Sequence, residues 1–342
     1  MAKYEYRSDD MKGELTVATL LAPYAAEVDA ALKRLMESGT KLGEVASDAV
    51  TKGGKRIRPS IALLACEAVS GSFERALPVA IAYELAHSAS LTQDDIIDES
   101  STRRGAPTVH NKYGVSNAIL VSDVLLFKIF EVLGTYGKVP LSKKRLAELL
   151  THIGAAARKA AEGEFLEVAL AAKSKPSESD YVNAAGLKTG SLFAGAAASG
   201  AIVGNATSRV VNDLYEYGYN LGVSFQVVDD ILDITGESKE MGKPLMKDLQ
   251  NDATNIIIIH ALQNADPYKR NAINSMMWKK SYGVADVLSL RTIFEELGSI
   301  AYAVDLSARH ASLARERLRG LAKSSARLKL EQLAQLLEAR RS

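Results

Sequence analysis

The sequence LTQDDIIDES, residues 91–100, sets three aspartates among apolar residues at the spacing DDxxD. FQVVDDILDITG, residues 225–236, repeats this spacing 135 residues further along the chain. On an α-helix, residues four apart share a face, so the first and third aspartates of each cluster lie together. Such a pair of like charges destabilises an isolated helix by about 0.2–0.5 kcal/mol, and apolar neighbours imply partial burial, which raises this cost. A compensating positive charge is therefore expected at each cluster.

Mg²⁺ is the cation that these carboxylates suit best. It takes oxygen ligands, keeps several waters, and binds through one or two carboxylates together with substrate phosphates. With a single Cys, the chain has no Cys/His ligand set typical of Zn²⁺. One DDxxD alone fits a solvated acidic face or a helix N-terminus equally well, but two copies in apolar helices favour a metal and diphosphate site. The predicted ligands are Asp94, Asp95, Asp98, Asp229, Asp230 and Asp233.

The rest of the chain predicts an all-α protein. Among 342 residues only 8 are proline, long Ala- and Leu-rich stretches carry apolar residues at three- and four-residue spacings, and alternating β-type runs are scarce. Ser177, followed three residues later by Asp180, predicts a helix start by a capping box. Turn residues cluster at points such as 204–205 and 266–267, but no break is typical of an interdomain linker. We therefore predict a single domain over residues 1–342.

Composition argues against several other classes of protein. A net charge of +1 argues against nucleic-acid binding, which usually requires a strongly basic domain. The single cysteine, Cys66, cannot form an intrachain disulfide, which fits a reducing compartment and favours a cytoplasmic protein. The first thirty residues contain no uninterrupted apolar segment of the secretory type. The uncharged stretch 189–208 has the length of a membrane span, but its glycines and hydroxyl residues predict a tightly packed core helix followed by a turn.

Two basic stretches lie close to the first acidic cluster in the sequence. TKGGKRIRPS, residues 51–60, places Lys55, Arg56 and Arg58 between a glycine pair and a helix start, where cations suit a phosphate, although most basic loops are simply solvated. Arg103 and Arg104 follow the aspartates within five or six residues. They either form structural ion pairs with the carboxylates or hold a diphosphate between guanidinium and metal.

In their order along the chain, these motifs resemble the trans-prenyltransferases, the family of polyprenyl and geranylgeranyl diphosphate synthases. GGKRIRP, DDIIDESSTRRGAPTVH, LKTGSLF, FQVVDDILD and GKPLMKD carry the resemblance, which runs from about Gly53 to Asp248. It implies a helical bundle of the isoprenoid synthase type, with a deep central cavity and two acidic helices facing each other across its mouth. It also implies a homodimer and a role in isoprenoid lipid biosynthesis.

The resemblance further implies a Mg²⁺-dependent transferase reaction. Isopentenyl diphosphate and an allylic diphosphate of C5 to C15 would be the substrates, and the allylic partner would ionise before the isopentenyl double bond attacks it. The implied roles are as follows: Arg103 and Lys188 bind the allylic diphosphate, Lys243 adds charge beside it, Lys55, Arg58, His87 and Arg104 bind isopentenyl diphosphate, and Thr189 and Gln226 face the reacting carbons. Each polar residue also has a plain structural interpretation, as a core histidine, a helix end or a buried hydrogen bond.

Two positions depart from the family pattern. Gln93 stands where a histidine is usual, and Asn251 to Thr254 stand where a Gly-Lys pair is frequent. Asp252 thus replaces a cation, which weakens the positive charge on the allylic side and admits an altered substrate preference or a poorly active member.

Product length depends on the residues one and two helical turns before the first aspartate. In the family these residues floor the cavity that holds the growing chain, and here they are the small Ala86, Ala89 and Ser90. Small residues favour geranylgeranyl diphosphate or a longer product, unless Phe127 or Phe130 on the next helix restores a floor.

The C-terminal stretch 307–342 is basic and amphipathic, with nine Lys and Arg against three Glu. It is expected to pack as a final bundle helix with a solvated basic face. A weak contact with an anionic membrane surface is the alternative, and Arg340 or Arg341 reaching the substrate is another.

Two other functions remain open from the sequence. A terpene cyclase or a head-to-head synthase shares the aspartate clusters, but would not need the cations of GGKRIRP for a second diphosphate. A regulatory subunit would keep the fold without the chemistry, which the six aspartates and the basic residues argue against.

Overall fold

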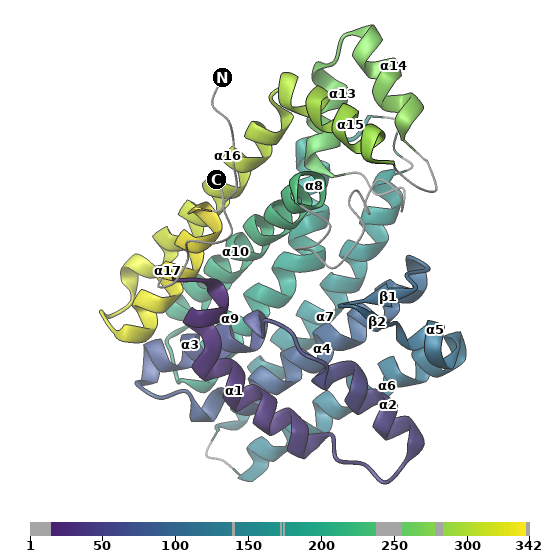
Figure 1. The fold of residues 1–342 in the computed structure, drawn as a ribbon. Coiled ribbons are helices and arrows are strands. Elements are labelled where there is room, and N and C mark those ends of the chain that lie inside the picture. Colours follow the sequence, from purple (N-terminus) through teal and green to yellow (C-terminus); the bar gives the residue numbers. More distant parts are fainter. Residues whose placement is uncertain are drawn as a thin grey trace.

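Long amphipathic segments with helix caps make up nearly all of the computed structural model, which describes residues 15–138, 141–171, 173, 175–236, 255–277 and 283–339 (Figure 1). The all-α prediction is confirmed for this part of the chain. Its helices are α1 (Val17–Leu35), α2 (Lys41–Thr51), α3 (Ile57–Ser70), α4 (Leu77–Ile97), α5 (Val109–Tyr113), α6 (Val115–Gly134), α7 (Lys143–Ala171), α8 (Glu178–Ala185), α9 (Ser191–Val203), α10 (Ser208–Thr235), α13 (Ile256–Asn264), α14 (Pro267–Met276), α15 (Val284–Glu296), α16 (Ser299–Arg317) and α17 (Ser325–Ala339).

Side-chain caps fix several helix starts where turn residues occur in the sequence. The Ser177 hydroxyl accepts from the backbone N–H of Asp180, whose carboxylate accepts from the Ser177 N–H, so the predicted capping box is present. Asp266 caps α14 ahead of a proline in its first turn. Before α10, Asn205 adopts a left-handed backbone with φ 65°. These caps confirm the predicted breaks at 177, 204–205 and 266–267.

A two-residue hairpin follows the first acidic cluster. β1 (Thr102–Arg103) pairs antiparallel with β2 (Ala106–Pro107), and Arg103 lies opposite Ala106. Residues 104 and 105, which connect the strands, both have positive φ. This tight turn sets the direction in which the side chains of Arg103 and Arg104 project.

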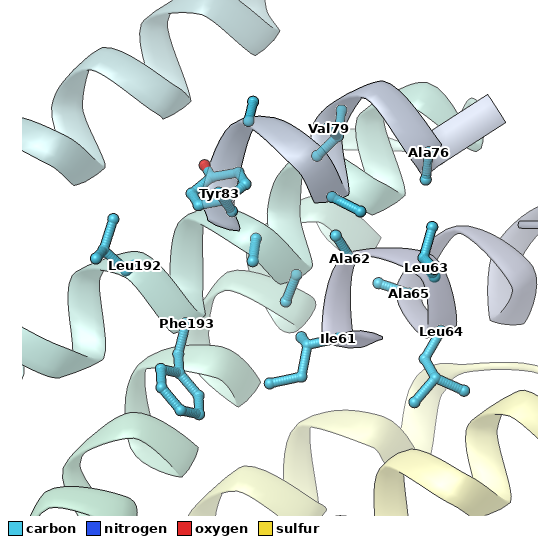
Figure 2. Close-up of a cluster of buried hydrophobic side chains, with 14 of the residues drawn as sticks. Ile61, Ala62, Leu63, Leu64, Ala65, Ala76, Val79, Tyr83, Leu192 and Phe193 are labelled. Carbon is cyan, nitrogen blue, oxygen red and sulfur yellow. The ribbon is translucent and has the colours of Figure 1, made fainter. Parts of the chain in front are cut away.

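Helix α9 is the centre of the molecule. All of its residues are buried, and it packs against α3, α7 and α10. Figure 2 shows Leu192 and Phe193 at its start in one cluster with Ile61 of α3 and Tyr83 of α4, and the Tyr83 hydroxyl lies 3.1 Å from Ser199 Oγ of α9. A Cβ on Gly200 would meet the Ala62 carbonyl oxygen at 2.1 Å, so α9 and α3 are in backbone contact there. The stretch 189–208 is therefore a core helix and a turn, as predicted, and none of the described helices is long and apolar enough to cross a membrane.

The buried side chains form two hydrophobic clusters. The larger cluster joins α1 to α4, α6, the first part of α7, α9, the first half of α10, the end of α16 and α17. The smaller cluster joins the end of α7, α8 and the last part of α10 to α13, α14, α15 and the first part of α16. Helix α10 thus contributes Leu221 to the larger cluster and Val227 to the smaller.

The C-terminal helices are part of the core. Leu330, Leu333 and Leu337 of α17 are buried in the larger cluster. The C-terminal stretch thus packs on the core, as predicted, but it forms the end of α16 and the separate helix α17 rather than one helix. Residues 340–342 lie outside the described residues.

Candidate active site

The first acidic cluster occupies the last turn of α4. Asp95 is 5% exposed, and its Oδ1 accepts a hydrogen bond from Arg103 Nε at 2.7 Å. Asp98 caps the helix, and its backbone N–H donates to the Asp94 carbonyl oxygen. The hairpin thus brings Arg103 back to the end of α4, where it forms an ion pair with Asp95.

Asp94 lies in surroundings that disfavour its charged form. Burial and the nearby carboxylates of Glu164 and Asp98 raise its pKa from 3.8 to about 7, although Lys188 and Arg103 pull in the opposite direction. A carboxyl with these surroundings is stabilised in its charged form by an added cation. Glu164 was not predicted as a site residue, because no motif in the sequence distinguishes it from a solvated residue of α7.

The second cluster lies near the end of α10, where a hydrogen-bonded chain holds its middle aspartate. Asp230 is 3% exposed and accepts from the Tyr181 hydroxyl at 2.6 Å and from Gln226 Nε2 at 3.1 Å. Gln226 Oε1 in turn accepts from Thr189 Oγ1 at 2.7 Å. Asp229 lies on the exposed side of the helix, and Asp233 is buried. The predicted residues Thr189 and Gln226 are thereby linked to the second cluster through the Gln226 amide. Tyr181, which sequence reasoning missed, is a separate donor to the other oxygen of Asp230.

Lys188 sits in a π-helical turn, Gly186–Gly190, between α8 and α9. Its Nζ lies 2.7 Å from Glu164 Oε2 and also pairs with Glu167. Burial alone would lower the pKa of Lys188, but Glu167, Glu164 and Asp94 outweigh it and raise the pKa. The amine therefore stays charged, beside the first acidic cluster. Single-turn π segments inside helices are frequent at functional sites.

A close backbone contact holds this π turn against α7. A Cβ on Gly163 of α7 would lie 2.1 Å from the backbone nitrogen of Lys188. A Cβ on Gly186 would lie 2.1 Å from the side-chain hydroxyl of Tyr219 on α10. A side chain at 163 would therefore displace the backbone of the turn, whereas one at 186 would first displace the Tyr219 ring.

The basic residues gather at the start of α3. Arg58 Nη1 lies 3.1 Å from His87 Nε2, and the guanidinium carbon lies 4.8 Å from the centre of the Phe193 ring. Arg58 Nε is buried, with no hydrogen-bond partner in the described part of the chain. Burial lowers the pKa of Arg58 to about 10, although the negative charges of Glu84, Asp229 and Asp94 act to raise it. Burial and the positive charge of Arg58 both lower the pKa of His87. His87 is thus neutral beside a charged arginine.

Arg104 and Lys55 complete the basic group at its exposed edge. Arg104 donates to the carbonyl oxygen of Gly53. A Cβ on Gly54 would lie 3.0 Å from Arg104 Nη1, so the glycine lets the guanidinium pass the loop. Lys55 is exposed. Lys243, together with residues 251–254 and hence Asp252, lies outside the described residues.

Arg56 does not join this basic group. It was grouped with the neighbouring cations as suited to a phosphate, but its side chain is buried and bonds Asp29, Glu84 and the carbonyl oxygen of Val50. The expectation for Arg56 was therefore wrong as a phosphate contact, because the left-handed backbone at this residue, with φ 47°, turns the side chain inward.

The two acidic clusters and the basic group lie within reach of one another's charges. Asp94 and Asp229 both act on Arg58, and Lys188 and Arg103 both act on Asp94. Among the described residues, no group of three or more His, Cys, Asp or Glu is arranged to hold a metal ion by itself. The donors are hard carboxylate oxygens, so the residues fit Mg²⁺, which takes few protein ligands and fills its shell with water and phosphate oxygens.

The prediction that Phe127 or Phe130 restores a cavity floor is not supported by their positions. Both lie on α6 with 64% and 67% of their surface exposed, pointing away from the core. Ala86 and Ala89 are buried on α4, and Ser122 Oγ of α6 approaches the Ala89 carbonyl oxygen at 3.4 Å.

Comparisons of the sequence and of the structure relate this chain to known proteins. The profile of the family described as Polyprenyl synthetase matches residues 40–294. A geranylgeranyl diphosphate synthase of Saccharolobus solfataricus is 35% identical over 313 residues, which are 91% of this chain and 94% of that protein. The crystal structure of geranylgeranyl pyrophosphate synthetase from Pyrococcus horikoshii matches with TM-score 0.87 and 33% identity, over 95% of this chain and 98% of that one. A polyprenyl synthase from Caulobacter crescentus, complexed with calcium and isoprenyl diphosphate, matches with TM-score 0.85 and 28% identity, over 97% and 100%.

Proposed function

The chain belongs to the polyprenyl synthetase family, and on that premise we propose that it is a prenyl diphosphate synthase that joins isopentenyl diphosphate head to tail to an allylic diphosphate. One observation carries the proposal: two DDxxD clusters lie near a separate group of basic residues, so that an aspartate from each cluster, Asp94 and Asp229, acts on the charge of Arg58. Two charged regions of this kind suit two diphosphate substrates.

The aspartate clusters on α4 and α10 would hold Mg²⁺ against the allylic diphosphate. Bound Mg²⁺ neutralises the negative charge that develops on the departing diphosphate. Lys188, paired with Glu164, and Arg103, paired with Asp95, would bind the same diphosphate from the protein side. Lys243 is proposed to add charge there.

Arg58, His87, Arg104 and Lys55 would bind the diphosphate of isopentenyl diphosphate. The buried Arg58 Nε–H, which has no partner in the described residues, is available to an oxygen of that ligand. Its position over the Phe193 ring fixes the plane of the guanidinium.

Thr189 and Gln226 would present polar atoms to the reacting carbons. An allylic cation is stabilised by carbonyl and hydroxyl dipoles, and the hydrogen bond between these two side chains fixes their direction. Apolar walls would exclude water from the cation, and the proton lost after carbon–carbon bond formation would pass to the released diphosphate.

The product is proposed to be geranylgeranyl diphosphate or longer. The proposal is supported by the small Ala86 and Ala89 on α4, by the outward position of Phe127, and by relatives of that name at 35% identity. Product analysis with C5, C10 and C15 primers tests it, and a product of mainly C15 would refute the small-floor argument.

A homodimer of single-domain subunits is proposed as the working form. Exposed apolar side chains occur on two helices, α6 and α7, and suit burial against a second copy. They are Val115, Ile119, Leu120, Phe127 and Phe130 of α6, and Leu150, Phe165 and Val168 of α7. Because α10 enters both hydrophobic clusters, they form parts of one domain. A cytoplasmic location is supported by the buried free thiol of Cys66.

The deciding experiment is incubation of the purified protein with Mg²⁺, isopentenyl diphosphate and each allylic primer. Extended products that require Mg²⁺ support the proposal, and Asp94→Ala and Asp229→Ala should each abolish most turnover in a folded protein. A cyclised or head-to-head product would favour the related enzyme classes. A wild-type chain that is inactive alone would favour a regulatory subunit.

A further inference from the structure

Arg56 is a buried arginine with a strained backbone in the middle of the basic loop. Its φ of 47° and ψ of 38° lie in the left-handed region, which residues with a side chain rarely adopt. It directly precedes α3, between Lys55 and Arg58. Strain of this kind persists only where the surrounding contacts impose it, and it gathers at functional sites.

The Arg56 guanidinium joins three helices to the loop. Nε donates to Asp29 of α1 at 2.7 Å, Nη2 donates to the Val50 carbonyl oxygen of α2 at 2.9 Å, and Nη1 donates to Glu84 of α4. The side chains of Arg56 and Glu84 are 1% and 4% exposed. These contacts leave the side chain with one conformation and fix the backbone from which its neighbours project.

Helix α4 contacts this segment at two successive turns. Glu84 binds Arg56, and His87, three residues later on the same face, contacts Arg58. Glu84 also acts at a distance, because its charge opposes the lowering of the pKa of Arg58 and of Arg104 that burial causes. One buried carboxylate thus stabilises three arginines in the absence of any anion.

We propose that Arg56, held by Glu84 and Asp29, is a positioning residue for the isopentenyl diphosphate site. Its buried side chain holds the loop so that Arg58 meets His87 and the Gly53 carbonyl oxygen meets Arg104. Arg56 itself contacts no substrate. This inference rests on the proposed function, since it assigns the basic group to that substrate.

The experiment separates positioning from simple stability. Arg56→Met alone would leave the buried Glu84 carboxylate without its partner and destabilise the fold. The test variant is therefore the double substitution Arg56→Met/Glu84→Leu, which removes both charges together. Arg56→Lys keeps the positive charge, but an ammonium group cannot bond Asp29, Glu84 and the Val50 carbonyl oxygen in the same arrangement. The control is Arg145→Lys on α7, whose arginine likewise bonds a carbonyl oxygen and a carboxylate, at Ala206 and Glu148.

Steady-state kinetics and calorimetry are the readouts. In the double variant we expect the KM for isopentenyl diphosphate to rise about tenfold, equivalent to about 1.4 kcal/mol, while the KM for the allylic diphosphate and kcat change less than about threefold. Arg56→Lys should lie between this variant and wild type, and Arg145→Lys should match wild type. A folded double variant with an unchanged KM for isopentenyl diphosphate, or with both KM values raised equally, would overturn the inference.

Metal-free titration of isopentenyl diphosphate by calorimetry distinguishes this inference from the proposed function. If wild type elongates no primer, the proposed function fails, and binding alone decides the role of Arg56. Affinity about tenfold weaker in the double variant than in wild type and in Arg145→Lys supports positioning. Equal affinity, or no binding by wild type, overturns it.

Discussion

Substitution of Gly163 by alanine tests how closely the site geometry depends on one backbone contact. The added Cβ would lie 2.1 Å from the backbone nitrogen of Lys188 and 2.5 Å from its Cα. An ordinary contact begins near 3.4 Å, so α7 and the π turn would have to separate by about 1.3 Å. Neither atom belongs to a flexible side chain, and the displacement therefore passes directly to Lys188 and Thr189.

The size of the effect follows from two opposing contributions. Overpacking a tight contact costs about 1–3 kcal/mol, whereas replacing a helical glycine by alanine gains about 0.8–1 kcal/mol. The net loss of stability should therefore be small, at most about 2 kcal/mol. Catalysis should suffer more, because a shift of about 1 Å in a positioned group costs on the order of a hundredfold in rate.

Gly154→Ala provides the matched control. It lies on the same helix nine residues earlier, and an added Cβ there meets nothing within 4 Å. Urea denaturation should show Gly154→Ala at least as stable as wild type, with wild-type kcat, while Gly163→Ala is less stable than Gly154→Ala and loses most of its kcat. If both variants behave alike, the contact does not hold Lys188, and the reasoning is refuted.

The carboxylates and the exposed side of α6 give three further expected outcomes. Because folding raises the pKa of Asp94 from 3.8 to about 7, the folded metal-free protein binds more protons than the unfolded chain between these values, so its stability falls as pH rises through this range. Asp94→Asn should flatten that slope in a thermal melt, and equal slopes would contradict the assignment. Tyr181→Phe removes a donor from the buried Asp230 and should cost about 1.5–3 kcal/mol in urea denaturation, with lower kcat; no change would show the hydrogen bond to be unimportant. Phe127→Glu should give a monomer in sedimentation, whereas Tyr268→Glu, on α14 and even more exposed, should not; a persistent dimer would exclude this face.

The general fold and the aspartate clusters could be predicted from the sequence because their signals are local. Helical spacing, the Ser177 capping box and the Asp266 cap depend on residues within one or two turns. The DDxxD spacing likewise places carboxylates on one face without knowledge of the rest of the chain.

The remaining features depend on contacts between distant segments. Glu164 looks like a solvated residue until α7 packs beside the π turn that carries Lys188. The family resemblance assigns Arg58 and not Arg56 to a substrate, but the residue types in GGKRIRP do not show that Arg56 is buried against Asp29 and Glu84 while Arg58 meets His87. The exposure of Phe127 depends in the same way on how α6 packs on α4.

The division of the core into two clusters has a consequence for how the protein loses activity. Asp94 lies on α4, in the larger cluster, whereas Asp230 lies on the part of α10 that belongs to the smaller one. Parts of one protein open at different free energies, and those with fewer buried apolar contacts open at the lower end of this range. Gradual denaturation should therefore inactivate the protein while most of its ellipticity persists. A circular dichroism signal that looks native would then overestimate the fraction of competent molecules, and hydrogen exchange at α13 would report that fraction more faithfully.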